Sequence, residues 1–139
     1  WYELSNWAKP GGECRHNNTY WNGAQWWGVG PGAHSYFAGK RWWNVKHPNT
    51  YQNALARGNS PEASSELLSE ANKRDEFVML QIRMSEGISL SDLTEEEMAK
   101  VTKYRDSGHI EGANWDTGHL VLSRTGRLIA DRIVREMLV

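Results

Sequence analysis

The chain has little cysteine, no long apolar run and almost no net charge, and each shortage excludes a class of protein. The one cysteine, Cys14, cannot form an internal disulfide, which favours a reducing, cytoplasmic setting. No apolar run approaches the roughly 18 residues that a membrane-spanning helix requires, so we expect no membrane span. The formal net charge of -1 gives no global basic field that would attract nucleic acid.

Tryptophan, in contrast, is abundant and unevenly distributed. Seven of the eight tryptophans lie in the first 43 residues, whereas charged residues concentrate after Glu62. The composition changes between about residues 48 and 61, where proline, glycine, asparagine and serine favour turns. We therefore expect an aromatic, glycine-rich segment over residues 1–50 and a mainly helical domain over residues 51–139. The chain opens with Trp1 inside an expected strand over residues 1–5, which suggests a piece of a longer protein.

Local patterns predict a hairpin in the first part and a helix at the start of the second. Strands over residues 28–37 and 41–45 would be joined by a turn at residues 38–40. Ser60 is a good N-cap with Pro61 at the first helical position, so a helix is expected to begin there.

Two more helices are expected in the middle of the second part. Gly87 ends an apolar stripe whose members are Phe77, Leu80, Ile82 and Met84. Thr94 and Glu97 have the spacing of a capping box, which predicts a helix that begins there and ends at Gly108.

The last part of the chain indicates a winged-helix-like unit. A turn at residues 116–118, between expected strands over residues 110–115 and 119–122, predicts a small hairpin. A last helix begins at about Thr125, with an apolar face of Leu128, Ile129, Ile133, Met137 and Leu138. Together with the first part, these elements predict an α+β fold.

A winged-helix-like end also raises the hypothesis of a nucleic-acid-binding module. The last helix offers four cations to phosphates, namely Arg124, Arg127, Arg132 and Arg135. Asp131 and Glu136 interrupt that surface, and the whole chain is slightly acidic. These features favour a solvated helix face, so nucleic acid is the more distant alternative.

Residues 14–35 are the most informative part of the chain. Residues 14–21 read CRHNNTYW and residues 26–35 read WWGVGPGAHS. Tryptophans in pairs among glycine, asparagine and proline do not follow the period of a helix or a strand, and this composition suits a wall around a flat ligand. The glycines do not open a helix, as a dinucleotide loop would, and the cysteine and histidines lack the paired spacings of a zinc site.

These motifs resemble a known family. Residues 2–8, 14–21 and 28–35 are similar to the latter part of the radical S-adenosylmethionine (SAM) proteins related to oxygen-independent coproporphyrinogen III oxidase. Residues 76–87 and 122–127 resemble the family's carboxy-terminal helical domain. Within residues 14–21, the His-Asn-x-x-Tyr-Trp pattern is similar to that of the heme-chaperone branch and differs from that of the true oxidase.

The resemblance implies an amino-terminal partial TIM-like barrel whose Cys-x-x-x-Cys-x-x-Cys loop holds a [4Fe-4S] cluster, with SAM on the fourth iron. This chain would supply the end of that radical SAM barrel with a β-hairpin, followed by the winged-helix-like domain. It lacks the cysteine loop, so we expect no cluster and no catalytic residue in it. Its opening strand resembles the last barrel strand, whose end at Asn6, Trp7 and Ala8 would approach the SAM adenine.

The resemblance also implies two functions for the whole protein. Members of the chaperone branch bind heme and deliver it to heme-requiring enzymes, whereas the oxidase decarboxylates two propionates of coproporphyrinogen III. We expect the chaperone function, with His16 as the heme-iron ligand and Tyr20 and Trp21 as stacking surfaces. In the alternative interpretation, His16 only hydrogen-bonds its loop. Cys14 is either a thiolate ligand or a small buried side chain.

Overall fold

The computed structural model describes residues 1–139 and divides them into two compact units. Unit 1 combines residues 1–23 with residues 74–139, and unit 2 comprises residues 24–73. Seven α-helices and five short strands give the mixed helix and sheet content that the sequence predicts. The units do not follow the expected division at residue 50, because chain segments on both sides of that position pair in one sheet. No helix is long and apolar enough to cross a membrane.

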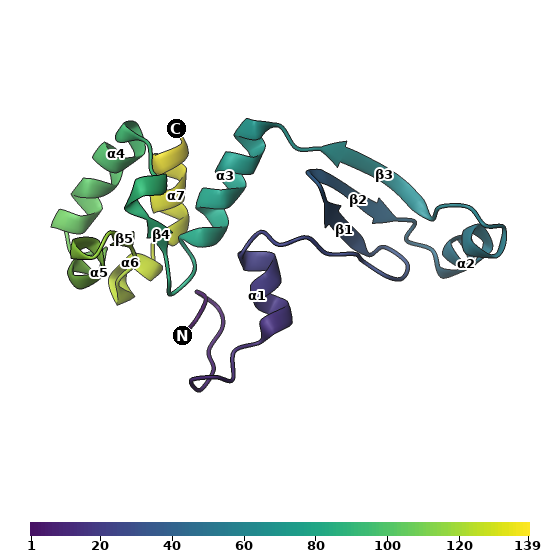
Figure 1. The fold of residues 1–139 in the computed structure, drawn as a ribbon, viewed down its shortest axis with the longest axis horizontal. Coiled ribbons are helices and arrows are strands. Elements are labelled where there is room, and N and C mark those ends of the chain that lie inside the picture. Colours follow the sequence, from purple (N-terminus) through teal and green to yellow (C-terminus); the bar gives the residue numbers. More distant parts are fainter. The chain divides into compact units, whose positions relative to one another are not determined.

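Unit 2 is built on a three-stranded antiparallel sheet in the order β1-β2-β3 (Figure 1). Strands β1 (His34–Phe37) and β2 (Lys40–Asn44) confirm the expected hairpin. Its turn places Ala38 and Gly39 at positive φ, a conformation that glycine adopts without steric cost. Strand β3 (Glu62–Leu67) covers the other edge of β2.

Two elements of unit 2 differ from the sequence prediction. Helix α2 (Pro48–Ala56) fills a segment that we expected to be rich in turns, since Pro48 fits the first helical position. The prediction of a helix that begins at Ser60 is wrong. The residues that follow form β3, which pairs with the free edge of β2. Helix α3 (Glu70–Gln81) begins only after Ser69, whose Oγ accepts a hydrogen bond from the backbone N–H of Asn72 at 3.1 Å.

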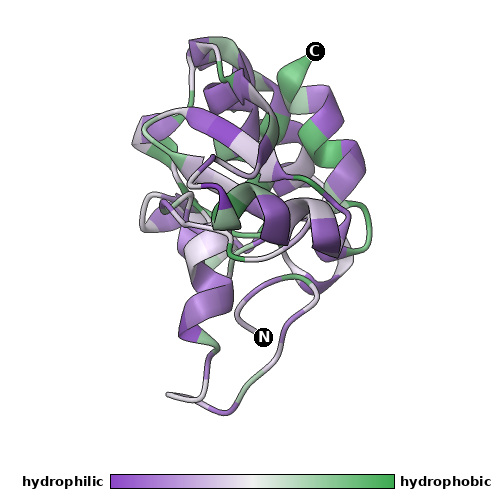
Figure 2. Cartoon of the chain, turned by 90° about the vertical axis from the view of Figure 1, so that its right-hand side faces the viewer, coloured by the Kyte–Doolittle hydropathy of each residue, from purple (hydrophilic) through white to green (hydrophobic).

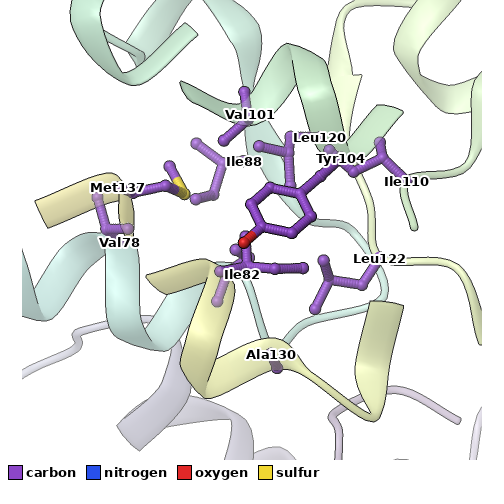
Figure 3. Close-up of a cluster of buried hydrophobic side chains, with 11 residues drawn as sticks. Val78, Ile82, Ile88, Val101, Tyr104, Ile110, Leu120, Leu122, Ala130 and Met137 are labelled. Carbon is purple, nitrogen blue, oxygen red and sulfur yellow. The ribbon is translucent and has the colours of Figure 1, made fainter. Parts of the chain in front are cut away.

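Unit 1 has an apolar core between α3, α4 (Glu95–Asp106) and α7 (Ala130–Leu138) (Figure 3). A two-stranded sheet of β4 (Ile88–Ser89) and β5 (His119–Leu120) adds side chains to it. Helix α7 packs on α4 and carries hydrophobic and hydrophilic residues in turn along its length (Figure 2). The buried core consists of Val78, Ile82, Ile88, Val101, Tyr104, Ile110, Leu120, Leu122, Ala130, Ile133 and Met137.

The expected hairpin over residues 110–122 is wrong. Helix α5 (Gly112–Asp116) occupies the expected first strand, and Ile110 forms only a single bridge with Leu122. Strand β5 pairs instead with β4, which follows the turn after α3 and directly precedes a short 3-10 helix. The pairing partner of β5 is therefore distant in sequence, and local turn signals carry no information about it.

Both ends of the chain also differ from expectation. The opening strand over residues 1–5 is reduced to isolated bridges of Glu3 with Asn6 and Met84. The last helix is divided into α6 (Arg124–Arg127) and α7, because the backbone leaves the helical conformation at Ile129. Leu128, expected on the apolar face, consequently lies 83% exposed. A 3-10 helix, η1 (Leu90–Asp92), precedes α4.

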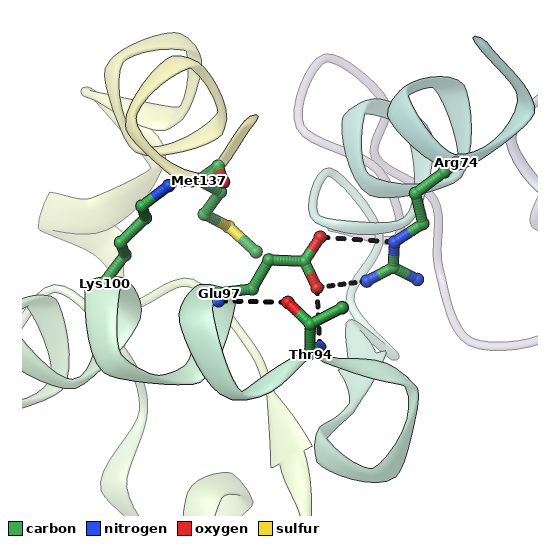
Figure 4. A network of polar contacts seen from close by, with 5 residues as sticks. All are labelled: Arg74, Thr94, Glu97, Lys100 and Met137. Atoms are coloured by element: carbon green, nitrogen blue, oxygen red, sulfur yellow. Dashed lines mark hydrogen bonds and ion pairs between the residues drawn. The ribbon is translucent and has the colours of Figure 1, made fainter. Parts of the chain in front are cut away.

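The expected capping box at the start of α4 is confirmed (Figure 4). Thr94 Oγ1 accepts a hydrogen bond from the backbone N–H of Glu97 at 3.2 Å, and Glu97 Oε2 accepts one from the backbone N–H of Thr94 at 2.8 Å. Arg74 of α3 adds a two-point ion pair to the same carboxylate. Burial acts to raise the pKa of Glu97, but the hydrogen bonds from Arg74 and Thr94 hold it below the ordinary value of 4.5.

Replacing Glu97 with glutamine is expected to lower the free energy of unfolding by about 1–2 kcal/mol at pH 7, because charge-assisted hydrogen bonds are lost. Since the folded pKa is lowered, this stabilisation is present above about pH 4.5 and disappears as the pH falls through the folded pKa. Urea unfolding at pH 7 and at pH 3 measures the change. Glu96→Gln, at an exposed pair with Lys100, is the control. An equal loss for Glu97→Gln at both pH values would contradict the expectation.

Candidate functional site

The segment that carries the His-Asn-x-x-Tyr-Trp pattern forms helix α1 (Arg15–Trp21) in unit 1. The helix brings His16 and Tyr20 together, because residues four apart lie on the same helix side. The Nε2 atom of His16 and the Oη atom of Tyr20 are hydrogen-bonded at 3.0 Å. Their rings meet edge to face, with centroids 5.1 Å apart and an interplanar angle of 81°. His16 is exposed, so this side of α1 is open to solvent.

Trp21 lies on another side of α1, about 140° around the helix from His16. The guanidinium of Arg83 stands 4.9 Å from the centroid of the Trp21 ring. Gln81 Nε2 donates a hydrogen bond to the Trp21 carbonyl oxygen at 2.9 Å. Trp21 therefore anchors the end of α1 to the last residue of α3 and to Arg83 after it, and the structure does not gather Trp21 with His16 and Tyr20 on one face.

Cys14 precedes α1 and is exposed. Because the side chain is exposed, the interpretation of Cys14 as a small buried side chain is wrong. The protein contains no group of three or more histidine, cysteine or acidic side chains arranged to hold a metal ion.

The tryptophans at positions 26 and 27 belong to unit 2. Trp26 pairs through its backbone with Tyr36, and their ring centroids are 5.3 Å apart. Trp27 is 71% exposed and meets the buried Trp42 edge to face, with centroids 4.8 Å apart. These rings pack around the sheet of unit 2, which gives them a local structural role.

The expected SAM-contacting residues follow the opening segment of unit 1. The side-chain amide of Asn6 donates a hydrogen bond to Glu3 Oε2. Trp7 is 67% exposed, whereas Ala8 is half-buried. Trp7 borders a cavity of about 330 Å³, whose other lining residues are Leu4, Arg124, Arg127 and Leu128. An exposed indole at this position offers a flat apolar face, while Asn6 is committed to its own loop.

Glu3 and Arg83 hold the opening segment in place, and sequence reasoning missed both. Glu3 is fully buried, and its Oε1 accepts a hydrogen bond from Arg83 Nε at 2.7 Å. The backbone N–H of Leu4 donates to the Arg83 carbonyl oxygen at 2.9 Å. No local pattern marks two opposite charges 80 residues apart, so no signal in the sequence could have paired them.

The relatives of the chain identify its family. No family model matches it. The chain is 46% identical over 138 residues to the heme chaperone HemW of Mycobacterium tuberculosis. The aligned residues cover 99% of this chain and 35% of that protein. The chain is homologous to the heme chaperones HemW. The HemW of Bacillus subtilis is 35% identical over 88 residues, which cover 63% of this chain and 23% of that protein.

The chain spans about a third of the length of the M. tuberculosis HemW that it matches. Among solved structures, coproporphyrinogen III oxidase (HemN) from Escherichia coli, described as a radical SAM enzyme, is similar with a TM-score of 0.60. The match covers 82% of this chain and 28% of that structure, at 15% sequence identity. The fold is therefore HemN-like, and the HemW relatives confirm the family that the motifs predict.

Proposed function

We propose that this chain is the carboxy-terminal part of a radical SAM heme chaperone, and that it binds heme at His16 for delivery to target enzymes. The observation that carries the proposal is the exposed imidazole on α1, in a chain 46% identical to a HemW over 99% of its length. Neutral imidazole is a common axial ligand of heme iron. The adjacent Tyr20 ring adds apolar surface against which a porphyrin can pack.

The whole protein would hold its [4Fe-4S] cluster and SAM on a barrel of which this chain supplies only the end. The residues of this chain do not fit the cluster, because three thiolates are required and Cys14 is the one cysteine. For SAM, we propose that Asn6, Trp7 and Ala8 lie at the end of the barrel and would approach the adenine, with the exposed Trp7 indole as a flat apolar surface. The barrel and the heme-accepting enzymes would then be the macromolecular partners, and the cytoplasm the compartment.

A winged-helix module that binds nucleic acid is less well supported. Strands β4 and β5 have two residues each, which leaves no extended wing. Arg132, one of the expected phosphate contacts, is paired with Glu136 at 2.9 Å. The pKa of Glu136 is lowered to about 2, first by its hydrogen bond with Lys103 and then by that with Arg132, so the carboxylate stays charged beside these cations.

Replacing His16 with alanine in the complete protein, with its cluster reconstituted, is expected to weaken hemin binding by about tenfold or more and to change the Soret band. An iron ligand is lost, while the fold survives because the side chain is exposed. Hemin titration followed by absorbance measures both effects. His47→Ala is the matched control, since His47 is exposed in unit 2 and makes no capping bond.

An unchanged affinity and spectrum for His16→Ala would contradict the ligand assignment. If the wild-type protein also converts coproporphyrinogen III with consumption of SAM, the oxidase function replaces the chaperone function. His16 would then have no purpose as an iron ligand, because a porphyrinogen contains no metal.

A further inference from the structure

The hydrogen bond between His16 and Tyr20 occupies the nitrogen that heme iron would use. We propose that Tyr20 is an internal competitor of heme for His16, so that binding exchanges the bond to Tyr20 for a bond to iron. The inference rests on the proposed heme-binding role of His16 and adds a control of affinity and release at the same site. It is carried by the 3.0 Å contact between Tyr20 Oη and His16 Nε2.

The two nitrogens of His16 are not equally accessible to a porphyrin. Nδ1 neighbours the ring carbon that joins the side chain to the helix, whereas Nε2 is the outer nitrogen of the imidazole. The porphyrin plane stands across the iron–nitrogen bond and extends widely on all sides. Approach through Nδ1 would press the macrocycle against α1, so Nε2 is the nitrogen available to a bulky ligand.

Ligation through Nε2 and the bond to Tyr20 exclude each other in both tautomers of neutral His16. If the phenol donates to Nε2, it uses the lone pair that iron requires. If Nε2 carries the hydrogen and donates to the phenol, Nε2 has no lone pair to offer. Heme binding must therefore break this contact in either state, and Tyr20 acts as a positioning residue that returns His16 to the heme-free geometry.

The competition is mild, because both groups lie near the surface. The bond is solvent-exposed, and a hydrogen bond of this kind changes an equilibrium by about two- to tenfold. A weak internal competitor suits a carrier, since it favours release without preventing binding. The ring contact is separate from this effect, because the edge-to-face packing of Tyr20 on His16 does not require the hydroxyl group.

Tyr20→Phe in the complete protein removes the competing hydroxyl group and keeps the ring contact with His16. It is expected to raise hemin affinity by about two- to tenfold and to slow hemin transfer to excess apomyoglobin by a similar factor. The Soret position should stay unchanged, because His16 remains the axial ligand. Tyr2→Phe removes the same hydroxyl group where no hydrogen bond to it is formed, and should leave both quantities unchanged.

A double-mutant cycle with His16→Ala makes the test decisive. The gain from Tyr20→Phe should vanish in the His16→Ala background, because the phenol then has nothing to compete for. If His16→Ala weakens binding but Tyr20→Phe leaves affinity unchanged or lowers it, the competition is overturned while the proposed function stands. If His16→Ala binds hemin like the wild type, both the proposed function and this inference fail.

Discussion

Replacing Gly87 with alanine is expected to destabilise unit 1 by about 4 kcal/mol. Gly87 has a φ of +69°, and an added Cβ would lie 2.1 Å from the backbone oxygen of Leu120. That oxygen belongs to β5, which pairs with β4 immediately after Gly87, so the backbone cannot move away without disturbing the small sheet. The left-handed conformation and the steric overlap each cost about 1–3 kcal/mol.

Gly118→Ala is the matched control for this prediction. Gly118 has a φ of +88°, but nothing lies within 4 Å of an added Cβ. Only the conformational cost of about 1–2 kcal/mol is therefore expected there. Urea unfolding followed by circular dichroism compares the two variants. Equal losses for Gly87→Ala and Gly118→Ala would show that the contact with Leu120 is unimportant.

Replacing Arg83 with methionine is expected to destabilise unit 1 by about 3 kcal/mol. Methionine keeps an apolar stem but leaves the fully buried carboxylate of Glu3 without its cation. The backbone N–H of Ser5 and the amide of Asn6 still donate to Glu3, so the loss lies at the lower end of the range for a broken buried pair. The variant also removes the cation from the face of Trp21, which loosens α1.

Two comparisons sharpen this prediction. Arg132→Met breaks an exposed pair with Glu136 and should cost less than about 1 kcal/mol. The double variant Glu3→Met with Arg83→Met removes both charges and should recover part of the stability, because no unpaired charge stays buried. If Arg83→Met costs no more than Arg132→Met, the buried pair does not hold the opening segment.

The elements that the sequence predicts well depend on residues close together along the chain. The capping box of Thr94 and Glu97 spans one helical turn, and the hairpin of β1 and β2 closes through Ala38 and Gly39. In contrast, β3 depends on the free edge of β2, and β5 depends on β4. Ser60 and Pro61 form a typical start of a helix, but the pairing of the following residues with β2 outweighs this local preference.

The candidate site shows the same limit. Family motifs locate His16 and Tyr20, and their spacing of four explains the contact once residues 15–21 are known to form a helix. The same helix directs Trp21 away from His16 and Tyr20. The motif alone gave no sign of this, and we expected Tyr20 and Trp21 to form one stacking surface. The contact of Arg83 with Trp21 could not be predicted from the sequence, because Arg83 follows α3 and lies 62 residues after Trp21 along the chain.

Unit 1 is built from two segments that are far apart in sequence, and this sets the order in which the units can fold during synthesis. Unit 2 is continuous and can complete its sheet while the ribosome is still translating the rest. The opening segment must wait, because Arg83, the partner of Glu3, follows 80 residues later. During that interval the carboxylate of Glu3 has only its local donors, Ser5 and Asn6, and lacks its cation. The buried ion pair of unit 1 can therefore form only after Arg83 has been translated, when unit 2 is already complete in sequence.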